Sequence, residues 1–151
     1  MEQSRLQPSD NANQLIQGQQ TLLLSTTSAS GQPECSYAPY VRDEQGVFYI
    51  FVSELAVHTQ NMLDTSIASV LFIQPEQQAQ NIFARERVVF ECSVKAIGQQ
   101  DPNFDCQLQA MNDKFGETID LLRNLSDFHL LALTAINGKY IAGFGQAFSI
   151  A

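Results

Sequence analysis

Short apolar runs separated by turn sequences fill residues 20–96, and this pattern constrains the fold more than any other feature of the chain. The runs at 20–27, 34–42 and 47–52 are rich in Leu, β-branched and aromatic residues, and Gly-containing turns lie between them. Runs of this composition predict β-strands, and the short turns between them predict hairpins. We therefore expect an antiparallel β core, in which the third strand is buried on both faces.

The segment after the third strand carries helical signals instead. Ser53 can cap a helix that runs through residues 55–64, and Leu55 would then face the sheet. The chain returns as an apolar strand at 69–74 and, after a polar loop, enters a long strand at 82–96. The inserted helix would thus connect the third and fourth strands of the β core.

The long strand shows a clear alternation of side-chain types. Every second position is apolar and the positions between are mostly polar, with the apolar set at Val88, Phe90, Cys92 and Val94. A period of two predicts one buried face and one open face. Pro39 in the second run cannot donate a hydrogen bond to a neighbouring strand, so that run is expected at an edge or a bulge.

Helices and a hairpin are expected outside the β core. Start and stop signals predict a short helix in an N-terminal arm at 1–19, and an apolar stripe predicts one or two helices in an insertion at 102–125, broken at Gly116. The dipeptide Asn137–Gly138 between two apolar runs predicts a terminal hairpin. No repeat or linker divides the chain, so residues 1–151 are expected to form one mainly β domain of the α+β class.

Charge and hydropathy limit the partners of such a domain. The formal net charge is −8, which disfavours broad attraction to nucleic acid or to an anionic membrane. No apolar run approaches the roughly 20 residues that span a bilayer, and the N-terminus lacks the apolar segment of a secretion signal. The 3 cysteines are widely spaced without a C-x-x-C pair, so no structural zinc site is indicated. We expect a cytoplasmic protein.

Two arginines stand together in a chain that otherwise scatters its basic residues. Arg85 and Arg87 are two positions apart in the predicted strand, so both side chains would lie on one face. Two guanidinium groups on one face can clamp a phosphate or a carboxylate through charge-assisted hydrogen bonds. The alternative is pairing with surface carboxylates, which are plentiful in this acidic protein. The spacing alone leaves both interpretations open.

The inserted helix carries a second polar pair. His58 and Asn61 are three positions apart, near the end of a buried strand, and such a pair can line a ligand site. The alternative is a partly exposed helix face without a role. His129 lies in a predicted strand and is more typical of a core or edge histidine than of an iron ligand. No metal-binding histidine spacing occurs, so no protein metal site is predicted.

Several short motifs together resemble those of a known family. They are SYAPY at 36–40, S-x-L-A-x-H-x-x-N from Ser53, F-A-R-x-R from Phe83, and GFGQAF at 143–148. The chain resembles the pyridoxamine 5′-phosphate oxidase-like superfamily of FMN-binding split barrels, and within it the haem-utilisation branch. The resemblance covers residues 20–150. It implies a six-stranded split β-barrel that forms a homodimer, with two equivalent cofactor clefts at the dimer interface.

The resemblance also implies which residues hold a small planar cofactor, haem or FMN. The phosphate of FMN would lie near Val52, Ser53 and His58, and near the strand that carries Arg85 and Arg87. In the haem branch the same arginines would meet the haem propionates. Flavin-binding relatives usually carry Lys at the position of His58, and a neutral imidazole attracts phosphate only weakly.

Iron ligation and catalysis are less well supported by the resemblance. Asn61 would lie beside the cofactor, and His58 or His129 are the iron-ligand candidates in this chain. The haem branch carries its proximal histidine in a C-terminal extension, whereas this sequence ends at Ala151, which weakens the case for ring-opening haem degradation. As an enzyme, the chain could be an FMN-dependent oxidoreductase or resemble a haem-degrading oxygenase. Three functions remain open: a haem-binding protein of the haem-utilisation type, an FMN-dependent oxidoreductase, and a non-catalytic dimer that has lost its cofactor.

Overall fold

The structure is a computed structural model, and it describes residues 7–150. The α-helices in this range are α1 (Pro8–Gln17), α2 (Val57–Thr65), α3 (Pro102–Phe115) and α4 (Thr118–Arg123). The strands are β1 (Thr21–Thr27), β2 (Pro33–Pro39), β3 (Val41–Arg42), β4 (Phe48–Ser53), β5 (Ile67–Ile73), β6 (Arg87–Ile97), β7 (Phe128–Gly143) and β8 (Gln146–Ile150). Two 3₁₀ helices, η2 (Glu76–Gln78) and η3 (Ile82–Ala84), lie between β5 and β6. None of the helices in the described range has the length and apolar content to cross a membrane.

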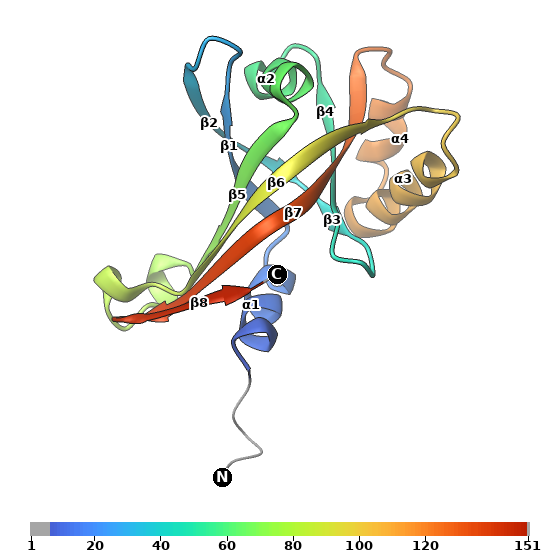
Figure 1. The fold of residues 1–151 in the computed structure, drawn as a ribbon. Coiled ribbons are helices and arrows are strands. Elements are labelled where there is room, and N and C mark those ends of the chain that lie inside the picture. Colours follow the sequence, from blue (N-terminus) through green and yellow to red (C-terminus); the bar gives the residue numbers. More distant parts are fainter. Residues whose placement is uncertain (1–6, 151) are drawn as a thin grey trace.

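The strands form one antiparallel sheet whose two edges are joined by the chain itself. The order is β2-β1-β5-β6-β7-β4-β3, with β8 paired to β7 outside this path. The edge strands β2 and β3 are separated in sequence only by Tyr40, so the sheet must curl until its edges meet (Figure 1). The predicted mainly β, α+β split-barrel fold is confirmed. The sheet has 8 strands in place of six, because the run 34–42 divides at Tyr40 and β8 is a separate strand.

Alternating side chains of the strands fill the barrel. Leu22 and Leu24 of β1 and Val88 of β6 point inward and are at most 2% exposed, so the predicted period of two is confirmed. Four aromatic rings pack at the centre with centroids 5.3 to 5.7 Å apart: Tyr40, Phe48, Phe72 and Phe90. Burying one such side chain contributes roughly 1.5–3 kcal/mol, so this cluster is a main source of stability.

The helices α3 and α4 pack on the outer side of β4 and β7 (Figure 1). Leu108 and Met111 of α3 join Tyr49 and Leu130 of the strands in a second apolar cluster. Gly116 ends α3 with a positive φ of 84°, which confirms the predicted break between the two helices. Because the other face of β4 lies in the barrel core, this strand is buried on both faces as its continuous apolar run predicts.

The strand β7 continues where the sequence predicts a hairpin turn at Asn137–Gly138, so that prediction is wrong. These two residues pair with Glu91 and Phe90 of β6. A Cβ atom on Gly138 would lie 2.7 Å from the Phe90 ring, so the glycine permits close packing rather than a turn. The turn comes instead at Gly145, where φ is 64° and the chain enters β8.

Two element boundaries near the predicted site also differ from expectation. Helix α2 begins at Val57 with Ala56 at its N-cap, and Ser53 instead accepts a hydrogen bond from the Leu55 amide in a preceding turn. Leu55 is therefore 90% exposed and does not face the sheet. Strand β6 begins at Arg87 rather than at residue 82, because residues 82–84 form the 3₁₀ helix η3.

Candidate functional site

The outer face of the sheet carries an exposed apolar row. Cross-strand partners point to the same face of a sheet, and the register aligns four apolar side chains from β2, β1, β5 and β6: Tyr37, Leu23, Leu71 and Val89. Tyr37 is 61% exposed and Leu23 is 45% exposed. Contiguous apolar surface of this kind marks interaction or ligand sites on proteins.

The arginine pair at the end of this face is arranged differently from the prediction. Arg85 precedes β6, and its Nε and Nη2 groups donate to the Gln74 carbonyl at 2.9 and 2.6 Å. Arg87 lies in the strand and donates from Nη1 to the Arg85 carbonyl at 3.2 Å. The prediction that both arginines lie in the strand is wrong, because Arg85 comes after η3 and before β6, which starts at Arg87. Within residues 7–150 neither arginine has a carboxylate oxygen within 4.0 Å, so the alternative of surface ion pairs is not realised.

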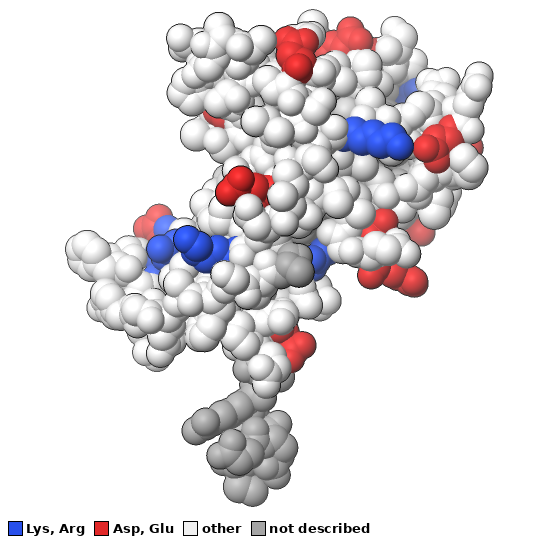
Figure 2. Space-filling view, in the orientation of Figure 1, with Lys and Arg blue, Asp and Glu red and all other residues white. Residues whose placement is uncertain are grey.

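Lys139 of β7 provides a second cation on the face of Arg87. In the β6–β7 register Arg87 lies opposite Ile141 and Val89 lies opposite Lys139. The two cations are therefore diagonal neighbours, with Cβ atoms roughly 7 Å apart. Figure 2 shows Lys and Arg side chains gathered at this end of the molecule, over the lower part of the sheet. No local sequence signal links the two residues, because only the register brings them together.

His58 projects from the first turn of α2 toward β2. Its Nδ1 lies 2.7 Å from Oγ of Ser36, and the side chain is partly buried. This burial lowers the pKa of His58 below its usual 6.5, and the nearby Glu34 carboxylate offsets the shift only in part. The imidazole is thus neutral at pH 7. Among the described residues, its Nε2 has no hydrogen-bond partner.

Two further predicted site residues lie in the interior. Val52 is 6% exposed and belongs to the barrel core. Asn61 is 5% exposed, and its Nδ2 donates to Oγ1 of Thr26 at 3.1 Å, which ties α2 to β1. The Val52 side chain therefore packs in the core, and the Asn61 side chain makes a hydrogen bond inside the chain.

Ser53 and His129 belong to a polar cluster where β4 ends and β7 begins. Ser53 donates from Oγ to Oδ2 of Asp127 at 2.8 Å. Nε2 of His129 lies 2.6 Å from Oε1 of Glu54, and the Glu54 amide donates to the Asp127 carbonyl at 2.8 Å. These contacts fix the junction of the two strands. The described residues contain no group of three or more His, Cys, Asp or Glu that could hold a metal ion.

The predicted residues fall into two groups at opposite ends of the sheet. The residue after α2, Ser66, accepts a hydrogen bond at its carbonyl from the Val94 amide of β6. The stretch of β6 from Arg87 to Val94 spans roughly 20 Å, at about 3.3 Å per residue. Within one chain Arg87 therefore lies at the opposite end of β6 from the C-terminal end of α2.

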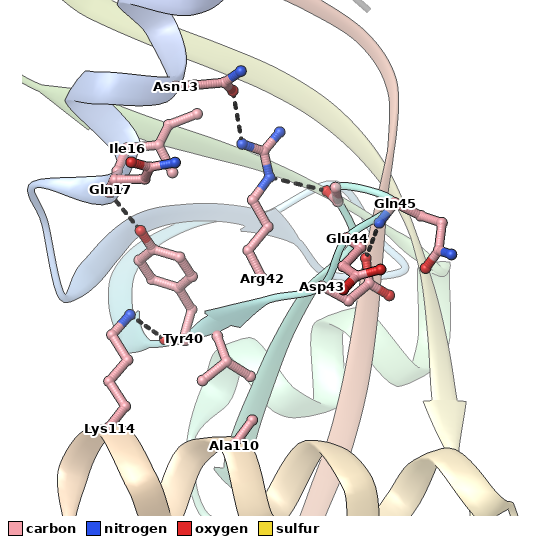
Figure 3. A pocket seen from close by; sticks show the side chains of 12 residues that line it. Asn13, Ile16, Gln17, Tyr40, Arg42, Asp43, Glu44, Gln45, Ala110 and Lys114 are labelled. Atoms are coloured by element: carbon pink, nitrogen blue, oxygen red, sulfur yellow. Dashed lines mark hydrogen bonds between the residues drawn. The ribbon is translucent and has the colours of Figure 1, made fainter.

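A separate cavity of about 660 Å³ lies between α1, the β3–β4 turn and α3 (Figure 3). Arg42 and Lys114 line it, and sequence reasoning selected neither residue. They are far apart in the sequence and line the same cavity only because α3 packs beside β3. No periodicity or motif indicates that arrangement.

Comparison with known proteins shows where the chain belongs. Residues 8–142 match the family described as Pyridoxamine 5'-phosphate oxidase. The chain belongs to the pyridoxamine 5′-phosphate oxidase family. Heme oxygenase HutZ from Vibrio cholerae serotype O1 is 36% identical over 149 residues, which cover 98% of this chain and 82% of HutZ. The motif resemblance, including its haem-utilisation branch, is confirmed.

Solved structures show the same fold as this pyridoxamine 5′-phosphate oxidase family member. The structure of HutZ from Vibrio cholerae, described as a haem storage protein, matches with a TM-score of 0.82 and 29% identity, over 91% of this chain and 96% of that one. Campylobacter jejuni ChuZ matches with a TM-score of 0.84 and 28% identity over 94% of this chain. The chain spans only 58% of the length of ChuZ. The similarity thus extends over the barrel and its covering helices.

Proposed function

We propose that this protein binds haem in a cleft built from two copies of the chain. The observation that carries the proposal is the 36% identity to heme oxygenase HutZ over nearly the whole chain. The match to a HutZ structure described as a haem storage protein supports the same ligand. Fold alone would serve haem and FMN equally, so the choice between them depends on individual side chains.

The open sheet face has the chemistry that haem requires. Haem is a flat, largely apolar ring with two carboxylates, and the apolar row that ends in Leu71 and Val89 offers a surface for such a ring. Arg87 and Lys139 beside that row would bind the carboxylates through charge-assisted hydrogen bonds. Bound haem would supply iron redox chemistry, which a protein tunes through the axial ligand, hydrogen bonds and burial.

His58 favours haem over FMN. A phosphate group needs positive charge, and burial lowers the pKa of His58 so that the imidazole is neutral at pH 7. In the tautomer whose Nδ1–H donates to Oγ of Ser36, the neutral imidazole would leave an unprotonated Nε2 to coordinate iron. His129 is less suited, because Glu54 already engages its Nε2.

The placement of the two groups is consistent with a homodimeric cleft. Arg87 lies at the end of β6 opposite to the end that contacts Ser66 after α2, so in this proposal a second copy supplies α2 to the cleft that holds Arg87. The exposed apolar row around Tyr37 and Leu23 would be covered in the same assembly. A two-fold dimer would hold two equivalent clefts, each with His58 from one chain and Arg87 from the other.

Titration of haemin into the purified protein tests the proposal. We expect a saturable Soret shift at one haem per chain, and a dimer in light-scattering measurements. Arg87→Gln should weaken haemin binding about tenfold or more, because a hydrogen bond to a charged group is worth about 1.5–3 kcal/mol. Arg123→Gln is the matched control, because Arg123 pairs with Asp105 on α3. A folded protein without a saturable Soret change would contradict haem binding.

Mixing two defective variants tests whether the cleft needs two chains. His58→Ala and Arg87→Gln would each damage both clefts of their own homodimer. After subunit exchange, mixed dimers would contain one cleft with both native side chains, so about a quarter of all clefts should regain native affinity. If binding is not recovered although the subunits exchange, the cleft does not combine His58 and Arg87 from different chains.

A further inference from the structure

The cavity between α1, the β3–β4 turn and α3 has the size of a small-molecule site. Its volume of about 660 Å³ lies within the roughly 300–1,000 Å³ typical of ligand pockets. Ile16, Val41 and Ala110 contribute apolar wall, and Arg42 and Lys114 approach it from the strand and from α3 (Figure 3). None of these residues belongs to the apolar row of the outer sheet face, so the cavity is independent of the haem proposal.

Both cations at the cavity keep unused hydrogen-bond donors. Arg42 donates from Nη1 to Oδ1 of Asn13 at 2.9 Å and from Nε to the Gly46 carbonyl at 3.3 Å. Its Nη2 group has no acceptor among the described residues. Lys114 donates from Nζ to the Tyr40 carbonyl at 2.8 Å, and an ammonium group has three donors. The cavity therefore presents N–H groups from two cations to whatever enters it.

The acidic residues at the cavity offset the charge of these cations only in part, since burial lowers the pKa of Arg42 by more than the nearby Tyr40 and Asp43 raise it. Asp43 uses both oxygens inside the turn, where it accepts from two backbone amides at 2.9 Å and from the Tyr49 hydroxyl at 3.1 Å. Glu44 is exposed, and within residues 7–150 no carboxylate oxygen lies within 4.0 Å of Arg42 or Lys114. Burial lowers the pKa of both cations, because water solvates them only in part. A bound anion would restore the lost solvation.

We propose that this cavity binds a small organic dianion, and that phosphate monoesters are the class that fits it best. The planar guanidinium of Arg42 matches phosphate oxygens, and Lys114 adds a point charge on another part of the cavity wall. A phosphate monoester carries a charge of about −1.5 to −2 at pH 7, which balances the two cations. The apolar wall around Val41 would contact the organic group of the ligand.

Phenyl phosphate is a suitable probe, with phenol as its neutral counterpart. Titration into the ¹⁵N-labelled full chain should shift the amide signals of Ile16, Gly46 and Ala110 saturably, whereas phenol should not. Lys114→Met keeps the apolar stem of the side chain, and it should weaken binding about tenfold to a hundredfold through loss of a hydrogen-bonded charge. Lys114→Arg should restore most of the affinity.

Two further variants make the test decisive. Lys95→Met changes the net charge equally but lies outside the cavity lining, so it should bind phenyl phosphate like the native protein. Glu44→Gln removes a negative charge at the cavity, and it should tighten binding at low salt. Thermal unfolding establishes that each variant is folded. The absence of saturable shifts up to about 10 mM probe, an equal loss in Lys95→Met, or weaker binding in Glu44→Gln would overturn the proposal.

Discussion

Replacing Gly138 by Ala should destabilise the protein, because a methyl group has no room at this position of β7. A Cβ atom there would lie 2.7 Å from Cδ1 and Cε1 of Phe90 and 2.9 Å from the Ile150 carbonyl oxygen. Contacts this short require a neighbour to move. Phe90 is 3% exposed in the barrel core, and the Ile150 carbonyl is backbone of β8, so neither can move without disturbing packing or pairing.

Two opposing effects determine the expected magnitude. Overpacking a well-packed core costs about 1–3 kcal/mol. Replacing a glycine in a conformation that Ala can adopt recovers about 0.4–1 kcal/mol, because the unfolded chain loses freedom. Gly138 has no positive φ, so this gain applies, and the net loss in the free energy of unfolding should be about 1–2 kcal/mol. In a chain of this length, each kcal/mol lowers Tm by about 2–4 °C.

Urea denaturation followed by circular dichroism measures this loss. With a slope of about 2 kcal/mol per molar urea, the midpoint of Gly138→Ala should fall by about 0.5–1 M. Gly143→Ala is a matched control in the same strand. Its Cβ would meet only Oε1 of Gln146, at 4.0 Å, so its midpoint should stay unchanged or rise.

A second variant distinguishes the continuous strand from a turn. Asn137 lies opposite Glu91 and is exposed, so Asn137→Val should change stability by less than about 0.5 kcal/mol in a strand. In a two-residue hairpin turn the same valine would need a positive φ and would cost about 1–3 kcal/mol. A native midpoint for Gly138→Ala, or a large loss for Asn137→Val, would refute the close-packing explanation.

Three other substitutions test the surroundings of α2. Thr59→Val should leave Tm unchanged or raise it, because the buried Thr59 hydroxyl has no hydrogen-bond partner among the described residues. A lowered Tm would contradict this expectation. In urea denaturation Met62→Ala should cost about 2–5 kcal/mol, whereas Leu55→Ser should be nearly neutral because Leu55 is 90% exposed. Burial keeps the folded-state pKa of His58 below 6.5, so the unfolded chain binds the proton more strongly and stability falls as pH drops below this value. His58→Gln should therefore reduce the difference in Tm between about pH 7.5 and about pH 5.5, and an unchanged difference would count against this role.

The β core was largely predictable, because inward side chains repeat with a period of two along the strands that form the barrel. Predictions from local sequence signals were wrong where pairing between strands determines the backbone conformation. Asn137–Gly138 is a strong turn signal, yet pairing with β6 keeps both residues in an extended strand. The sequence also did not predict how the sheet closes, since nothing local to residues 33–42 indicates that Tyr40 connects the edge strands β2 and β3.

The candidate site was predictable only where a motif names its residues. The motifs identified the family and selected His58 and Arg87, but periodicity extended β6 too far and placed Arg85 in the strand. Lys139 was missed because its proximity to Arg87 arises from the β6–β7 register. The cavity cations were missed for a similar reason, because they line the same cavity only through packing between distant segments.

The motifs select His58 and Arg87 together, yet the two residues lie in different parts of the sheet within one chain. Val94, which contacts the residue after α2, lies roughly 20 Å along β6 from Arg87, while His58 at the start of α2 contacts Ser36 of β2. In the proposed cleft, the two-fold axis of a dimer brings His58 of one copy and Arg87 of the other to the same haem. Haemin titration would report binding with or without this arrangement, whereas recovery of about a quarter of the clefts after subunit exchange occurs only when each cleft draws on both chains. Subunit exchange followed by haemin titration therefore tests the architecture of the site, which titration of the native protein alone does not.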